Sequence, residues 1–433
     1  MLYFCYLNII KMGCGSTKEQ IDPIKTNTSI KHLQIVDNNN PDQKKADLLQ
    51  ALNNLSNSTP ALTSKRTYTS KYNLFNFKPT SQQSLILYTS PTYQGNEFVS
   101  LTQTKKERKE QGQFKSSVNG IAVSYNKGFK MENVNQDKFF IILDNNTEIY
   151  CLIDGHGPYG HIIGQIIQDK VYTFFGTLFK HENLEENYES IFKTLFEEMN
   201  QTILKREIKE YTHYDPFLSG AAVTIVLREG DTLYHANVGN VLAYIFNYDK
   251  LCPSKYSLTQ LSFNDSNFES KVFENGKDMC FETDPEKTGI NYCFNPNDIN
   301  FEIRRIYENG GETRQLSGES KSRIFIKGKY FPGMIITRTI GDQIGNGIGC
   351  ICTPHVSKFQ LQRDIKYYLL ICTDGINNVL NHEKLLNIIQ GNEMLLLESI
   401  TNIVNEARGM FRSHLYSPDM TIVLKELKVG YDG

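Results

Sequence analysis

The stretch Tyr150-Cys-Leu-Ile-Asp-Gly-His-Gly-Pro-Tyr-Gly160 decides the fold, because an apolar run ends here in a carboxylate, glycines and an imidazole. The run from Ile149 to Ile153 has the length and composition of a buried strand. Asp154, Gly155 and His156 follow it directly, and glycine lets the backbone approach a ligand closely. We therefore expect charged groups where this strand meets solvent.

The same pattern returns far downstream. Tyr367 to Thr373 is a second apolar strand candidate, and it ends in Asp374 and Gly375. Two buried strands that both close on Asp-Gly would bring Asp154 and Asp374 to one edge of a sheet. Such a pair of carboxylates repels itself unless a cation or a proton lies between them.

A third carboxylate, Asp137, stands at the start of another strand candidate, Lys138 to Leu143. The three acids form a ligand set of oxygen atoms, without His or Cys at metal-binding spacing, and this favours Mg²⁺ or Mn²⁺ over zinc. Two such ions about 3.5–4 Å apart lower the pKa of a shared water, which can then attack a phosphoryl group. His156 is placed to protonate the departing oxyanion.

Each of these signals is weak alone, since an Asp-Gly pair after a strand is more often only a turn.

Composition excludes several other classes of protein. The 433 residues carry 46 basic and 48 acidic side chains, and no basic stripe suggests nucleic acid. Nine cysteines without C-x-x-C pairs indicate reduced thiols in the cytoplasm. No apolar stretch approaches the roughly 20 residues that span a bilayer.

Residues 1–115 are rich in Asn, Ser, Thr, Gln and Lys, and we expect a mostly disordered extension. Residues 12–18 match the myristoylation pattern M-G-x-x-x-[ST], with Gly13 as acceptor and Cys14 as a palmitoylation site. The match has meaning only if translation starts at Met12, and chance is the open alternative. Acylation would attach the protein to a membrane surface, because two lipid chains anchor stably.

Residues 116–428 form the expected folded domain. Strand patterns alternate there with pairs of amphipathic helices, which is typical of an α+β domain built in layers. The polar, irregular segment of about residues 265–301 is expected to be a surface insertion.

The ordered landmarks resemble the metal-dependent protein phosphatases of type 2C, over roughly Gly120 to Leu427. The segments that carry the resemblance are Asn135-Gln136-Asp137, Asp154-Gly-His-Gly-Pro-Tyr-Gly160, Ser219-Gly-Ala-Ala-Val-Thr224, Ala236-Asn-Val-Gly239, Gln260-Leu261 with Asn264-Asp265, Ile303-Arg-Arg-Ile-Tyr-Glu-Asn-Gly-Gly311, Phe331-Pro-Gly333, Thr337-Arg-Thr-Ile-Gly-Asp342 and Asp374-Gly375.

The resemblance implies a central antiparallel β-sandwich flanked on both faces by helix pairs, a four-layer αββα arrangement. It implies a phosphatase that acts on phosphoserine and phosphothreonine in phosphoprotein substrates, as a monomer. Two Mn²⁺ or Mg²⁺ ions would be held by Asp137, Asp154, the Gly155 carbonyl and Asp374. Asp154 and His156 would carry the catalysis, with His156 as general acid.

The chain also departs from the family pattern. Asn240 and Asn378 stand where the family has acids, and Pro418 stands at an expected ligand position, so Asp419 would have to reach the metal with a shift of one residue. The substrate-gripping Arg is absent at its usual spacing, and Lys130 is the nearest cation for phosphate binding. The alternative is therefore a pseudophosphatase that keeps the fold as a binding module.

Overall fold

The computed structural model describes thirteen stretches of the chain: residues 84–89, 97–102, 106–110, 112–130, 134–144, 147–178, 184–206, 214–249, 252–266, 290–319, 321–391, 395–412 and 416–429. The predicted acylation sites Gly13 and Cys14 lie outside these residues, and so does most of the predicted extension. Most of the predicted insertion also lies outside them.

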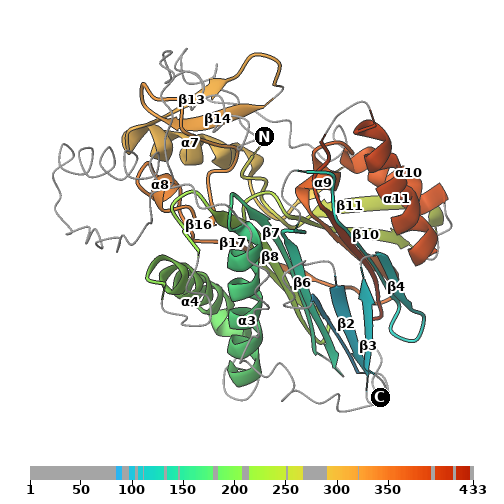
Figure 1. The fold of residues 1–433 in the computed structure, drawn as a ribbon. Helices are drawn as coiled ribbons and strands as arrows, with labels where there is room; N and C mark the ends of the chain where they lie inside the picture. The colour runs from blue at the N-terminus through green and yellow to red at the C-terminus, as the bar shows by residue number, and fades with distance from the viewer. Residues whose placement is uncertain are drawn as a thin grey trace, which may run out of the picture. The chain divides into compact units, whose positions relative to one another are not determined.

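Two large, mostly antiparallel sheets form the centre of the fold (Figure 1). The first sheet runs in the order β17 (His355–Gln360), β9 (Thr232–Val238), β8 (Gly220–Glu229), β7 (Thr147–His156), β6 (Asp137–Asp144), β1 (Leu85–Thr89), β2 (Glu97–Thr102) and β3 (Lys106–Glu110), and the short β16 (Ile340–Gly341) pairs with β8. The second sheet runs in the order β12 (Ile290–Tyr292), β11 (Cys252–Gln260), β10 (Leu242–Asp249), β18 (Ile365–Cys372), β19 (Met420–Leu427), β5 (Ile121–Asn126) and β4 (Gly112–Ser116). Only β11 and β12 pair in parallel among the pairings of the described strands.

Helices cover the outer face of each sheet, which confirms the predicted four-layer α+β fold. The first sheet is covered by α3 (Gly160–Leu178) and α4 (Leu184–Leu204), and the second by α9 (Asp374–Asn377), α10 (His382–Gly391) and α11 (Leu396–Met410). Asn381 caps the beginning of α10, because its side chain accepts a hydrogen bond from the Lys384 amide at 2.9 Å.

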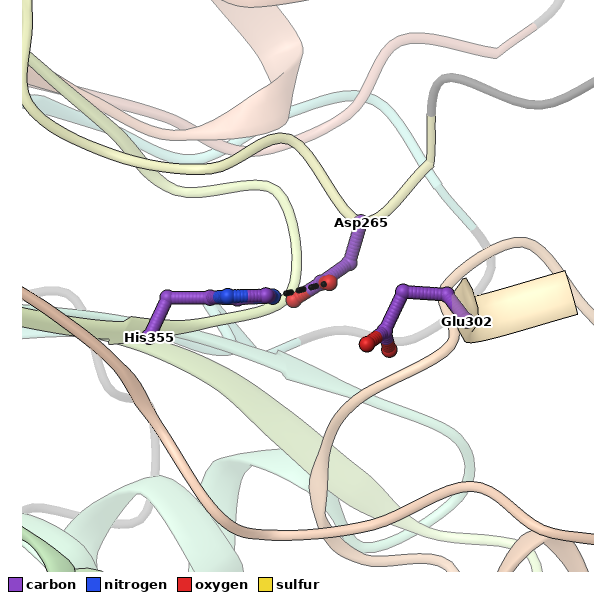
Figure 2. Close-up of side chains that lie close together, drawn as sticks. All are labelled: Asp265, Glu302 and His355. Atoms are coloured by element: carbon purple, nitrogen blue, oxygen red, sulfur yellow. Dashed lines mark hydrogen bonds and ion pairs between the residues drawn. The ribbon is translucent and has the colours of Figure 1, made fainter. Parts of the chain in front are cut away.

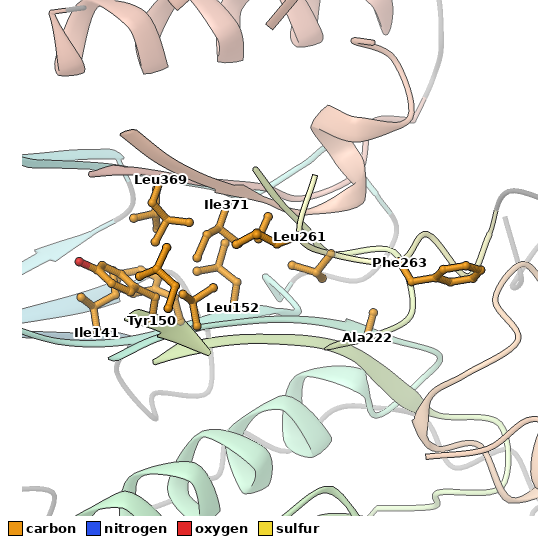
Figure 3. Close-up of a cluster of buried hydrophobic side chains, with 14 of the residues drawn as sticks. Ile141, Tyr150, Leu152, Ala222, Leu261, Phe263, Leu369 and Ile371 are labelled. Atoms are coloured by element: carbon orange, nitrogen blue, oxygen red, sulfur yellow. The ribbon is translucent and has the colours of Figure 1, made fainter. Parts of the chain in front are cut away.

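The strand β7 shows how the sequence divides its side chains between two cores. Tyr150 and Leu152 point into the space between the sheets, while Ile149, Cys151 and Ile153 pack against the helices on the outer face. This is the two-residue period of a strand that is buried on both faces. Figure 3 shows the inter-sheet core, where Tyr150 and Leu152 face Leu369 and Ile371 of β18. Burial of each such aliphatic side chain stabilises the fold by about 1.5–3 kcal/mol.

A smaller antiparallel sheet, β13 (Gly311–Gln315), β14 (Ser322–Ile326) and β15 (Pro332–Met334), follows the helix α7 (Ile299–Glu308). The short helix α8 (Gln343–Asn346) follows this sheet in the chain. Lys321, just before β14, donates a hydrogen bond to Asn378 in the turn that contains Asp374.

Two predicted boundaries are wrong. The sheet begins at Leu85 and not near residue 116, because β1 pairs with β6 along the register Leu85↔Leu143 to Tyr88↔Phe140. The apolar residues Leu85 to Tyr88 do predict a short strand, but the polar composition around them places the expected domain boundary too late. The insertion expected to reach residue 301 ends earlier, because α7 begins at Ile299 with the buried residues Ile299 and Ile303 on its inner face. Across the described residues, the helices are all too short or too polar to cross a membrane.

Candidate functional site

Asp137 and Asp154 lie opposite one another on neighbouring strands. They are register partners in the β6–β7 pair, with Asp137 as the first residue of β6 and Asp154 two residues before the end of β7. Asp154 continues the alternation that turns Tyr150 and Leu152 toward the other sheet, and Asp137 does the same for Phe139 in β6. The sequence pattern therefore places both carboxylates at one edge of the inter-sheet space.

The Asp137 carboxylate is bound by hydroxyl groups from the opposite sheet. Thr373, after β18, and Thr421, in β19, donate to Asp137 Oδ2 at 2.9 and 2.7 Å. Burial, together with the nearby negative charge of Asp419, nevertheless raises the pKa of Asp137 to about 7. This carboxylate thus lies in an environment that opposes its charge.

Asp374, the third predicted ligand, lies next to Asp154. The Asp374 backbone N–H points to Asp154 Oδ2 at 3.4 Å. Burial raises the pKa of Asp154 well above its usual value, and the charges of Asp374 and Asp137 raise it further. The amides of Asn240 and Asn378 donate to Asp374 Oδ2 at 3.4 and 3.1 Å. The fold therefore collects three carboxylates whose repulsion a cation would relieve.

Gly155 follows Asp154 at a point where the backbone has no space for a side chain. A Cβ atom here would lie 2.4 Å from the Gly160 carbonyl oxygen and 2.9 Å from that of Gln136. The Gly155 N–H donates to the Gln136 carbonyl at 3.3 Å. Only glycine fits this close approach, which explains why the strand must end in Asp-Gly.

His156 is paired with Asp342, a residue that the sequence analysis quoted only as part of a motif. The Nε2 atom of His156 lies 2.5 Å from Asp342 Oδ2, and the Thr339 hydroxyl donates to the same oxygen at 2.7 Å. Burial opposes a charged imidazole, but the carboxylate outweighs burial and raises the pKa of His156. Asp342 has a left-handed backbone with φ 45°, and Gly220 leaves room for its carboxylate, since a Cβ there would lie 2.2 Å from Oδ2.

Asp419 and Lys130 bind one another and the loop that precedes β6. The Asp419 oxygens accept hydrogen bonds from the backbone N–H groups of Gly128 and Gln136, both at 2.8 Å, and Lys130 forms an ion pair with the same carboxylate. The Lys130 ammonium also donates to Gln136 Oε1 at 3.2 Å, and its side chain is only 7% exposed. Asp419 therefore holds the loop at Gly128 and Gln136, with Lys130 as its counter-ion. The expected roles, metal ligand for Asp419 and phosphate binding for Lys130, stay predictions.

A second cluster of possible ligands consists of the buried acids Asp265 and Glu302 and the half-buried His355. Their ligand atoms all lie within 4.8 Å of one another (Figure 2). Its charges are already compensated. Arg338 contacts both Glu302 oxygens, at 3.0 and 2.6 Å, and Arg305 contacts them from the other side. Burial opposes the charge, but hydrogen bonds from the two arginines lower the pKa of Glu302 to about 2. This cluster is a structural ion network.

Among the described residues, the predicted ligands Asp137, Asp154 and Asp374 do not form a group whose ligand atoms all lie within 4.8 Å of one another. Asp154 is the neighbour of both other acids, because it is the register partner of Asp137 and the Asp374 N–H points to its Oδ2 atom.

Comparisons with known proteins find similarity to one family. A family model, Protein phosphatase 2C, matches residues 288–413. Two similar proteins from Arabidopsis thaliana are probable protein phosphatase 2C 35, which is 24% identical over 59% of this chain and 68% of its own length, and probable protein phosphatase 2C 61, which is 23% identical over 60% and 69%. A third, probable protein phosphatase 2C 52 from the same plant, is 22% identical over 60% of this chain and 55% of its own length.

The fold is similar to that of a solved structure, the serine-threonine phosphatase 2C from Toxoplasma gondii. The TM-score is 0.51, the identity is 11%, and the match covers 71% of this chain and 94% of the other. At this identity the likeness concerns the fold alone.

Proposed function

Because this chain is a divergent member of the protein phosphatase 2C family, we propose that it removes phosphate from phosphoserine and phosphothreonine in proteins. The observation that carries the proposal is the meeting of Asp137, Asp154 and Asp374 at one edge of the sandwich. Two of these acids come from the first sheet and one follows a strand of the second, so the complete fold is needed to assemble them.

The carboxylates fit two Mn²⁺ or Mg²⁺ ions. Asp137, Asp154 and Asp374, with the Gly155 carbonyl, would hold the ions, because hard oxygen ligands suit these cations. The raised pKa values of Asp137 and Asp154 support this fit, since they show negative charge that lacks compensation. When bound, such ions lower the pKa of a shared water to produce a nucleophile at neutral pH.

His156 would supply the proton that the departing serine or threonine oxygen needs. Its Nε2 atom must carry hydrogen because it faces the Asp342 carboxylate, so Nδ1 is the nitrogen available to the leaving group. Asp342 would position the ring and favour its protonated form. This pair is an acid held in one orientation, a requirement for efficient proton transfer.

The alternative, a pseudophosphatase that binds phosphoproteins without turnover, is favoured by one observation. Asn240 and Asn378 place neutral amides on Asp374, where acidic side chains would extend the ligand set. Loss of those acids leaves Asp137, Asp154 and Asp374 in place, and we therefore put the enzyme first.

A direct assay separates the two functions. The purified protein is incubated with a phosphothreonine peptide and Mn²⁺, next to the Asp154→Asn variant and a sample with chelator. We expect phosphate release by the wild type alone. Equal inactivity of wild type and variant, with retained binding of the phosphopeptide, would establish the pseudophosphatase.

We also propose acylation at Gly13 and Cys14 as a route to peripheral membrane attachment, on the sequence motif alone. Intact-mass measurement of the protein from its native cell tests this. A mass that includes a myristoyl group on Gly13 supports the proposal, and an unmodified terminus at Met1 contradicts it.

A further inference from the structure

The geometry points to Lys321 as the residue that binds the phosphate group of the substrate, an inference that rests on the proposed function of the same site. Lys321 immediately precedes β14 of the small sheet. Its Nζ atom donates to Asn378 Oδ1 at 2.7 Å and to Ser266 Oγ at 3.1 Å. These contacts bring a lysine from the small sheet to the turn that contains Asp374.

The chain of hydrogen bonds continues into the carboxylate site. Asn378 accepts from Lys321 and donates in turn to Asp374 Oδ2 at 3.1 Å. Lys321 is therefore two hydrogen bonds away from a proposed metal ligand.

The Lys321 ammonium retains one hydrogen-bonding position. An ammonium has three N–H groups, and the protein uses two of them in the part of the chain that the structure describes. Both Lys321 and Lys130 are half-buried residues, but the Lys130 ammonium is paired with the Asp419 carboxylate, whereas Lys321 contacts only an amide oxygen and a hydroxyl. The third N–H can therefore meet a group that arrives from solvent.

The other cations near the acidic groups are occupied. Lys130 is bound to Asp419 and Gln136, while Arg305 and Arg338 hold Glu302. Arg323, two residues after Lys321, is paired with Glu319. A phosphate dianion that approaches three carboxylates needs a cation on its outer side as well as metal ions, because charge-assisted hydrogen bonds are the strong contacts for such oxygens. Of these described cations, Lys321 alone combines a position beside the turn of Asp374 with an unused donor.

The test compares Lys321→Met with Lys321→Arg and with Lys327→Met, a matched removal of an exposed lysine just after β14. The substrate is a phosphothreonine peptide with Mn²⁺ present. For Lys321→Met we expect KM and the inhibition constant of inorganic phosphate to rise about tenfold, with kcat within about threefold, the size of one charged hydrogen bond. Lys321→Arg keeps the charge and should recover most of the loss, while Lys327→Met should behave as wild type.

A purely structural role for Lys321 predicts a different result. The variant would then lose thermal stability or kcat without a change in phosphate inhibition, and a wild-type inhibition constant in Lys321→Met overturns the inference. Inactivity of the wild type would contradict the proposed function and not this contact. Fluorescence anisotropy with the phosphopeptide and its unphosphorylated twin then decides: equal affinity of wild type and Lys321→Met for the phosphopeptide also overturns it.

Discussion

Two groups of buried acids occupy this molecule, and they differ in what surrounds them. Glu302 is held by Arg305 and Arg338, and its pKa falls to about 2. Asp137 and Asp154 receive hydroxyl and amide groups but little positive charge, and their pKa values rise. Burial acts in the same direction on both groups, so the arginines account for the opposite results.

The difference teaches how to separate a structural cluster from a functional one. Close packing of ligand atoms is the weaker criterion here, since Asp265, Glu302 and His355 satisfy it although two arginines already pair with Glu302. When nearby positive charge does not relieve the repulsion between carboxylates, the group favours the binding of a cation. Acids with pKa values perturbed in this way are typical of functional sites. Each prediction below changes one side of this comparison.

The largest effect is expected for Asp154→Asn, in the uncompensated group. The change removes the carboxylate that lies between Asp137 and Asp374, and we expect phosphatase activity to fall by about 10⁴-fold, roughly 5 kcal/mol of transition-state stabilisation. In chelator, the thermal midpoint of the variant should equal or exceed that of wild type because a repulsion is removed. A large loss of stability in chelator would show that Asp154 is structural.

Glu302→Gln changes the compensated group and should act on stability. It leaves Arg305 and Arg338 buried without their partner, which costs on the order of 3–5 kcal/mol. Denaturant unfolding of wild type and variant in chelator measures the difference. If Glu302→Gln instead leaves stability unchanged and abolishes Mn²⁺ binding, the second cluster is the metal site and the comparison fails.

The two groups also predict opposite pH dependences of stability in chelator. Asp137 has a folded pKa of about 7 against an ordinary value of 3.8, so its contribution is present at low pH and is lost as the pH rises toward 7, with a slope up to about 1.4 kcal/mol per pH unit. The stabilising contribution of Glu302 is present above pH 4.5, the ordinary pKa of its carboxyl group, and is lost as the pH falls toward 2. Unfolding of wild type, Asp137→Asn and Glu302→Gln between about pH 2 and 8 measures both, and a wild-type slope in Asp137→Asn would contradict the first assignment.

The smallest effect is expected for Asp342→Asn, which keeps the left-handed backbone because Asn tolerates that conformation. It removes the negative charge that orients the His156 ring and raises the pKa of His156. We expect kcat on a phosphothreonine peptide to fall about tenfold, while p-nitrophenyl phosphate, whose leaving group needs no proton, is almost unaffected. An equal fall on both substrates would show that Asp342 acts through the fold and not through the proton.

Much of this could be predicted from the sequence by itself. The two-residue period of β6 and β7 determines which side chains face the other sheet. Asp137 and Asp154 fall at positions of that period that face it. The Asp-Gly ending of β7 is likewise local, since no side chain fits at Gly155. Apolar periodicity was sufficient for the helices that cover the sheets, because amphipathic spacing is a local property.

Other features depend on contacts between distant parts of the chain, and only the tertiary structure decided them. Nothing near Asp419 in the sequence shows that the amides of Gly128 and Gln136 bind it, or that Lys130 is its counter-ion. The pairing of His156 with Asp342 spans 186 residues. Charge, hydrogen-bond partners and burial belong to positions in space, and residue order fixes those only through the complete fold; the sequence could therefore name the acids but not which of them carry uncompensated charge.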